Sequence, residues 1–212
     1  MMTETQKWPD LKINGVGKAT GGRYGDVLID GVCRVAGDLQ ADRFKANGKL
    51  KVYGHLQAHE MRVDGIVHIE GGIGGEHFVM NGMFKATGDC ELERLEAVGG
   101  FSTDGMLNAG RVNIWLQTQS KVKEIGGESI RVRRQTTFRN SKLWRWMMPK
   151  LVPELQTELI EGDDIDLENT VADVVRGNRV TIGPGCTIGR VEYRTELKTH
   201  KTAKIEKEEK LG

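Results

Sequence analysis

Residues 31–65, GVCRVAGDLQADRFKANGKLKVYGHLQAHEMRVDG, contain two consecutive copies of a 17-residue unit followed by the first glycine of a third. Glycines recur at positions 31, 48, 65, 82 and 99, and a second series occupies positions 37, 54, 71, 88 and 105. Every step in both series is 17 residues. Two interleaved series with one common period indicate a stacked repeat architecture.

Apolar residues fill fixed positions of the unit. When the units are aligned on the first glycine series, positions 3, 5, 9, 14 and 16 are mostly apolar. Position 3 holds Cys33, Leu50, Val67, Phe84 and Phe101. The spacing of two within each pair is typical of β-strands. Because each position recurs every 17 residues, equivalent strands should stack in parallel about 4.8 Å apart.

The sequence therefore predicts an all-β protein that folds as a parallel β-helix, or β-solenoid, with about 17 residues per coil. We expect the right-handed form, because crossovers between parallel strands are generally right-handed. The pattern divides the chain into five segments. These are a flexible N-terminus (1–10), a regular β-helix (11–133), a basic and Trp-rich insertion or linker (134–158), irregular coils (159–193) and a charged, disordered tail (194–212).

Composition restricts the class of function. The net charge of +1 provides no global field that would attract nucleic acid, so we expect no nucleic-acid partner. The sequence has neither a signal peptide nor an apolar run long enough to span a bilayer, and we expect a cytoplasmic protein, peripheral to the inner face of the cell membrane if it binds one. Cys33 and Cys90 occupy inward positions, which favours packing over a disulfide or a metal site.

The sequence offers little support for catalysis. His55, His59, His68 and His77 fall at positions 8, 12, 4 and 13, which are all predicted to face outward without converging. We therefore expect no catalytic residues, no cofactor and no metal. One stretch, IGPGCTIG at 182–189, resembles a hexapeptide repeat of the left-handed β-helix acyltransferases. An acyltransferase is accordingly an alternative hypothesis.

Two outward-facing features could bind a partner. Position 4 forms a possible ladder for an anionic partner, made of Arg34, Lys51, His68 and Lys85. We favour the interpretation that neighbouring acids, such as Glu70 and Asp38, neutralise this ladder. The insertion offers a second candidate surface, for a membrane or another partner, made of Lys142, Trp144, Arg145, Trp146, Met147 and Met148. Packing of these tryptophans over the solenoid is an equal alternative.

The two ends of a solenoid are candidates for self-association, because each exposes unpaired strand edges and an apolar rung. Candidate residues at the N-terminal end are Leu11, Ile13, Val27 and Ile29, and those at the other end are Ile188, Val191 and Tyr193. Capping by Trp8 and Pro9, or by the tail, is the alternative. Contact between like ends would give non-polar filaments if both ends associate and a dimer if only one does.

The glycine-punctuated stretch GDVLIDGVCRVAGDLQADRFKANGKLKVYGHLQA, residues 25–58, resembles the bactofilins, which are polymer-forming cytoskeletal proteins of bacteria. The resemblance implies a right-handed β-helix that polymerises without nucleotide into non-polar filaments, often at the membrane. The insertion and the second, irregular block depart from the uninterrupted bactofilin domain. We expect a non-enzymatic scaffold that associates with itself or with a paralogous bactofilin. A non-polymerising bactofilin-like adaptor is a further alternative.

Overall fold

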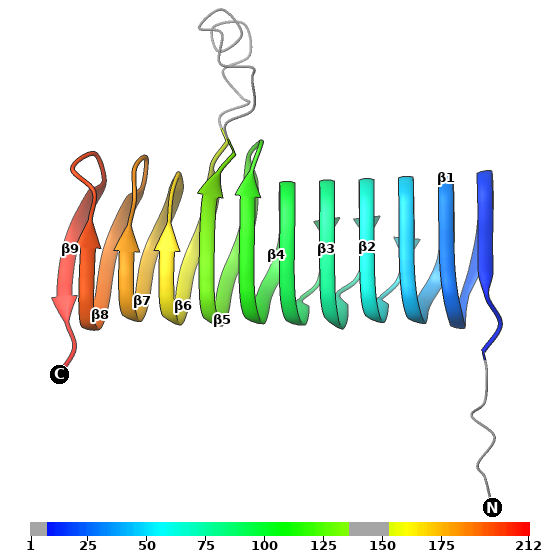
Figure 1. Cartoon of the computed structure of the whole chain (residues 1–212), viewed down its shortest axis with the longest axis horizontal. Helices are drawn as coiled ribbons and strands as arrows, with labels where there is room; N and C mark the ends of the chain where they lie inside the picture. The colour runs from blue at the N-terminus through cyan, green and yellow to red at the C-terminus, as the bar shows by residue number, and fades with distance from the viewer. Residues whose placement is uncertain (1–7, 136–152) are drawn as a thin grey trace, which may run out of the picture.

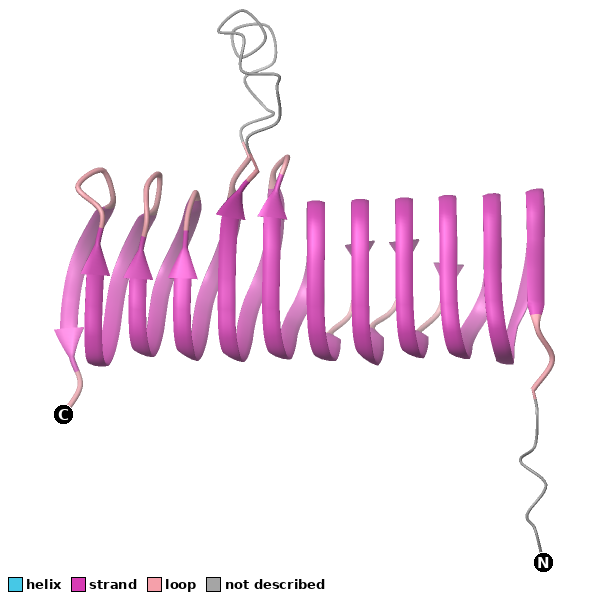
Figure 2. Cartoon of the chain, viewed as in Figure 1, coloured by secondary structure: helices cyan, strands magenta, loops and turns pink. Residues whose placement is uncertain are grey.

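The computed structural model describes residues 8–135 and 153–212, and in these the chain is an all-β solenoid without helix (Figures 1 and 2). Nine strands form one sheet in sequence order, and each pairs in parallel with the next. The strands are β1 Leu11–Tyr53, β2 Leu56–Ile69, β3 Ile73–Ala86, β4 Cys90–Leu116, β5 Ser120–Arg134, β6 Leu155–Leu167, β7 Thr170–Ile182, β8 Thr187–Thr199 and β9 Lys204–Lys210. The prediction of a parallel β-solenoid is confirmed.

The strand register reproduces the 17-residue period. Leu39 of β1 pairs with Leu56, Leu56 with Ile73, and Ile73 with Cys90. Side chains at the five predicted apolar positions are buried through the regular units and form one continuous core. Near its middle, the ring of Phe84 lies 5.1 Å from the rings of both Phe78 and Phe101. Stacking of identical positions in successive coils thus builds the core.

Glycine at position 1 of the unit is required by backbone geometry at a tight corner. Gly65 has φ of 140°, and a Cβ added there would lie 2.1 Å from the carbonyl oxygen of Gly48 in the preceding coil. An L-residue would meet both an unfavourable φ and a backbone clash. The first glycine series is therefore a consequence of coil-on-coil stacking.

The solenoid continues past the regular units with coils of other lengths. One core column runs through Leu107, Ile125, Ile160, Val175 and Val191, which are paired in consecutive strands. The step in this column is 15 residues from Ile160 to Val175 and 16 from Val175 to Val191. The irregular coils predicted at 159–193 therefore belong to the same sheet and core, and strand β6 begins at Leu155.

The prediction of a disordered tail over residues 194–212 is wrong. Strand β8 continues to Thr199, and β9 covers Lys204–Lys210, with Ile188 paired to Ile205. Parallel pairing uses main-chain groups, so a sequence rich in lysine and glutamate can add a rung when the preceding coil supplies an edge. Lys207 and Glu209 lie on the outside of this last rung, where they form an ion pair at 3.0 Å.

Candidate functional site

The N-terminal end of the solenoid presents an apolar rung with no further coil over it among the described residues. Leu11, Ile13, Ala19 and Tyr24 pack against the core and remain partly exposed. Leu11 and Ile13 were predicted from the sequence, whereas Ala19 and Tyr24 were missed. Alanine and tyrosine are not by themselves typical of an end face. The position of Ala19 was nevertheless informative, because it lies where position 5 of an extra unit would fall.

Val27 and Ile29 do not belong to this end face, and that prediction is wrong. Their side chains are only 2% and 1% exposed. The strand that begins at Leu11 supplies one more coil before them, and this coil covers both residues. The end face therefore consists of the rung that contains Leu11 and Ile13, and not of both rungs that the sequence suggested.

Trp8 and Pro9, the possible N-terminal cap, extend the first coil. The Gly25 amide donates a hydrogen bond to the Pro9 carbonyl at 3.0 Å, and the Arg23 guanidinium lies 4.7 Å from the centre of the Trp8 ring. The two residues thus pair with the next coil, and Leu11 and Ile13 stay partly exposed.

The C-terminal end differs from the prediction because β9 adds a rung. Ile188 and Val191 are completely buried, so their assignment to an exposed end face is wrong. Tyr193 is partly buried and pairs with Lys210. The partly exposed apolar side chains packed at this end are instead those of Tyr193, Leu197, Ala203 and Ile205.

Strand β9 makes the C-terminal end more polar than the N-terminal end. Glu208 pairs with Val191, so a glutamate occupies a rung position that is apolar in the coils beneath it. Charged terminal rungs are a usual way to protect the open end of a solenoid. The paired part of β9 ends at Lys210 opposite Tyr193, which leaves Leu197 partly exposed. The N-terminal end is consequently the better candidate for a strong contact.

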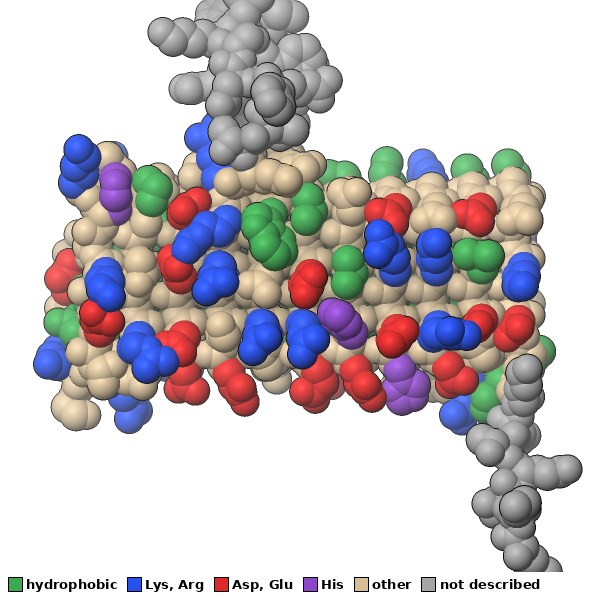
Figure 3. All heavy atoms as spheres, in the orientation of Figure 1, with side chains coloured by type: hydrophobic (Ala, Val, Ile, Leu, Met, Phe, Trp, Pro, Cys, Tyr) green, Lys and Arg blue, Asp and Glu red, His purple; other side chains and the backbone are tan. Residues whose placement is uncertain are grey.

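The ladder predicted at position 4 is partly neutralised. Lys51, His68 and Lys85 stack in register. Lys51 Nζ lies 2.6 Å from a carboxylate oxygen of Glu70, and this hydrogen bond raises the pKa of Lys51. Lys85 lies 3.7 Å from Asp104. Asp38, the other acid considered, accepts a hydrogen bond from the His55 amide at 2.7 Å. The face of the solenoid that Figure 3 shows also interleaves both signs of charge.

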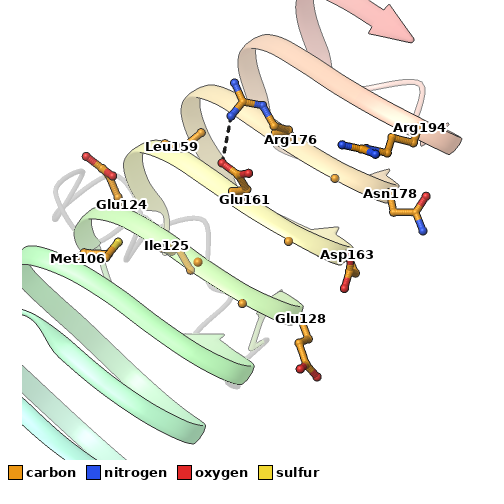
Figure 4. Close-up of a pocket in the computed structure, with 14 residues that line it drawn as sticks. Met106, Glu124, Ile125, Glu128, Leu159, Glu161, Asp163, Arg176, Asn178 and Arg194 are labelled. Carbon is orange, nitrogen blue, oxygen red and sulfur yellow. Dashed lines mark hydrogen bonds and ion pairs between the residues drawn. The ribbon is translucent and has the colours of Figure 1, made fainter. Parts of the chain in front are cut away.

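A groove of about 820 Å³ crosses strands β4–β8 (Figure 4). Glycines from successive coils form its floor, and a Cβ added at Gly162 would lie 2.2 Å from the Gly127 carbonyl oxygen. Glu128, Asp163 and Asn178 project along one side of the groove. Close packing of the coils thus explains these glycines, as it explains the corner glycines at position 1. The groove could not be predicted from the sequence, because its glycines fall outside the 17-residue series.

Within 8–135 and 153–212, no group of three or more His, Cys, Asp or Glu side chains could hold a metal ion. His59 pairs with Glu76 at 3.0 Å on the exposed surface. Burial raises the pKa of Cys90 to about 12 and that of Cys186 to about 11. These thiols lie in the core, as inward-facing small residues do.

The second candidate surface lies outside the described residues. Lys142, Trp144, Arg145, Trp146, Met147 and Met148 all fall within residues 136–152. In the part of the chain that the structure describes, no helix is long and apolar enough to cross a membrane.

Comparison with known proteins gives two relatives from Bacillus subtilis (strain 168), the uncharacterized proteins YhbF and YhbE. YhbF is 40% identical over 108 residues, which cover 50% of this chain and 42% of YhbF. YhbE is 40% identical over 237 aligned positions, which cover 95% of this chain and 98% of YhbE. No family model and no solved structure matches the sequence. The full-length similarity shows that this chain belongs to the same family as YhbE.

Proposed function

We propose that this protein is a non-enzymatic scaffold that assembles through the ends of its solenoid into nucleotide-independent, bactofilin-like polymers. The observation that carries the proposal is the apolar N-terminal rung, where Leu11, Ile13, Ala19 and Tyr24 remain partly exposed. Contact between two such rungs would remove apolar surface from water and cover two unpaired strand edges.

The two ends have different roles in this proposal. Contact between N-terminal ends is the stronger, since this rung carries apolar side chains at its inward positions. Contact between C-terminal ends is the weaker, because Glu208 interrupts the apolar surface around Leu197, Ala203 and Ile205. Alternation of the two contacts gives a non-polar filament, and the N-terminal contact alone gives a dimer. The partner is a second copy of the chain or a paralogue, and the basic, Trp-rich segment adds peripheral contact with the membrane.

Charge substitutions test the proposal. We expect Ile13→Lys to abolish long assemblies and leave at most dimers formed through the C-terminal ends. Leu197→Lys should leave dimers formed through the N-terminal ends. Val16→Lys adds the same charge to the first coil on an exposed side, because Val16 is 87% exposed, and it should assemble as the wild type does.

Sedimentation velocity measures the size of the assemblies, and electron microscopy shows their form. Far-ultraviolet circular dichroism tests whether each variant keeps its β structure. Assembly of Ile13→Lys at the wild-type concentration would exclude the N-terminal rung as the interface. A wild-type protein that stays monomeric at all concentrations would exclude the scaffold itself.

A further inference from the structure

One edge of the solenoid carries a row of exposed apolar side chains that the core does not use. They occupy position 2 of successive coils, directly after the corner glycines. The row consists of Val16, Val32, Ile66 and Met83, hereafter the apolar edge. Val16 is 87% exposed and Ile66 is 53% exposed. Hydrophobic side chains stand along this upper edge of the molecule toward the N-terminal end (Figure 3).

The strand register makes the apolar edge straight. Lys49 pairs with Ile66, and Ile66 pairs with Met83. At the N-terminal end, the corner glycines preceding Val16 and Val32 lie against each other in the same stack. With rungs about 4.8 Å apart, the five positions from Val16 to Met83 span about 19 Å. Lys49 is the one charged member of the row, and its long side chain can keep its ammonium group at a polar boundary.

A basic recess of about 370 Å³ lies beside the apolar edge. It is lined by Lys18, Ala19, Arg34, Ala36 and Tyr53, and the Tyr53 side chain is exposed. Within the described residues, no acidic side chain forms an ion pair with Lys18, Arg34 or Lys49, whereas Lys51 is held by Glu70. A recess with two available cations and a tyrosine suits an anionic, phosphate-bearing group at an interface.

Two acids on the other flank of the apolar edge have partners within the protein, and one of these partners is a cation. Asp30 accepts a hydrogen bond from the Asn47 amide at 2.5 Å, and Asp64 lies 3.3 Å from Arg62. Asn47 is neutral, so Asp30 keeps its negative charge, but the three cations Lys18, Arg34 and Lys49 outnumber it beside the apolar edge. This combination of an apolar row and adjacent cations matches the surface of an anionic bilayer.

The shape of the edge favours a bilayer over a protein partner. A stable protein interface buries about 800 Å² per partner. A projecting row one side chain wide is too narrow to provide that area by itself, whereas it can enter the deformable headgroup region of a bilayer.

We propose that the apolar edge and the basic recess together form a docking surface for an anionic lipid bilayer, with the solenoid axis parallel to the membrane. The apolar side chains enter the boundary between headgroups and acyl chains, and Lys18, Arg34 and Lys49 contact lipid phosphates. This proposal adds a defined surface to the membrane contact included in the proposed function. It does not depend on assembly, because the edge runs along the side of the solenoid.

The test is co-sedimentation of the full-length protein with vesicles of phosphatidylcholine containing phosphatidylglycerol, compared with vesicles of phosphatidylcholine alone. We expect binding to the anionic vesicles that weakens as salt is added. Lys18→Gln/Arg34→Gln should weaken binding about twenty-five-fold, since each cation near an anionic surface contributes a factor of about five. Ile66→Asn/Met83→Gln should weaken it about tenfold by removing apolar contact with the bilayer.

Matched controls carry the same changes on other faces. Lys12→Gln/Lys45→Gln removes two exposed cations at position 15, and Met106→Gln replaces an exposed methionine at position 8. Both controls should bind as the wild type does. Equal binding by the edge variants and their controls would overturn the proposal, as would equal binding to both vesicle types. Electron microscopy of the same variants without lipid separates the two proposals, because edge variants should still assemble.

Discussion

Replacement of Gly65 by alanine tests whether the coils stack as tightly as the structure shows. The added Cβ would lie 2.1 Å from the Gly48 carbonyl oxygen, and the backbone has φ of 140°. A strained φ costs about 1–3 kcal/mol. Displacing the neighbouring backbone adds about 1–3 kcal/mol, by analogy with overpacked cores. We therefore expect Gly65→Ala to lower the free energy of unfolding by about 2–6 kcal/mol.

Two other glycines separate these contributions. Gly15 has φ of 90° with nothing within 4 Å of an added Cβ, so Gly15→Ala should cost only the φ term, about 1–3 kcal/mol. Gly74 does not have a positive φ, and its nearest neighbour would be 3.9 Å away. Gly74→Ala should be neutral or stabilising by about 0.4–1 kcal/mol, because alanine restricts the unfolded chain.

Urea unfolding followed by circular dichroism measures the three variants. An Ile13→Lys/Leu197→Lys background blocks the contacts at both ends and so keeps assembly from contributing to the measured stability. A Gly65→Ala protein as stable as Gly74→Ala would refute the close stacking of coils at this corner.

Three further predictions concern the core and one ion pair. Phe84→Ala should lower the free energy of unfolding by about 3–5 kcal/mol in urea, because its 2%-exposed ring contacts Phe78 and Phe101; a loss below about 1 kcal/mol would contradict that packing. Cys33, Cys90 and Cys186 are buried and burial raises each pKa, so mass spectrometry should find iodoacetamide adducts only after denaturation; labelling of native protein would contradict their burial. A hydrogen bond from Arg176 lowers the pKa of Glu192, so Glu192 should stabilise the fold above the ordinary glutamate pKa of about 4.3 and lose this effect as the pH falls below it. Urea unfolding should accordingly show Glu192→Gln destabilised at pH 7 and closer to the wild type at pH 3, and a pH-independent difference would argue against this linkage.

The regular part of the fold could be predicted because parallel stacking copies the chemistry of one coil onto the next. Leu39, Leu56 and Ile73 had to be equivalent once the 17-residue period was recognised, and they pair in register. The same argument identified the inward positions of Cys33 and Cys90, which are both buried.

The last rung could not be predicted from apolar spacing. Residues 204–210 contain one apolar residue, Ile205, among lysines and glutamates, and the strand forms on the main-chain edge of β8. Because this rung was missed, Ile188 and Val191 seemed to be terminal. At the other end, the coil that begins at Leu11 was recognised, but the sequence did not show that it covers and buries Val27 and Ile29.

The surface features could be predicted less well, because side-chain pairing depends on neighbours in adjacent coils. The sequence placed Arg34, Lys51, His68 and Lys85 in one column, and the structure adds that Glu70 and Asp104 hold two of the lysines. The apolar edge was missed because position 2 also contains Lys49 and Gly100, which conceal its apolar character in the alignment.

Electron microscopy of the purified, tag-free protein without nucleotide, combined with sedimentation velocity over a range of concentrations, tests the central claim most directly. The proposed scaffold predicts regular filaments whose length grows with concentration and whose formation Ile13→Lys prevents. A monomer that persists at every concentration, or a discrete trimer as expected of a hexapeptide-type acyltransferase, would contradict assembly through the ends of the solenoid.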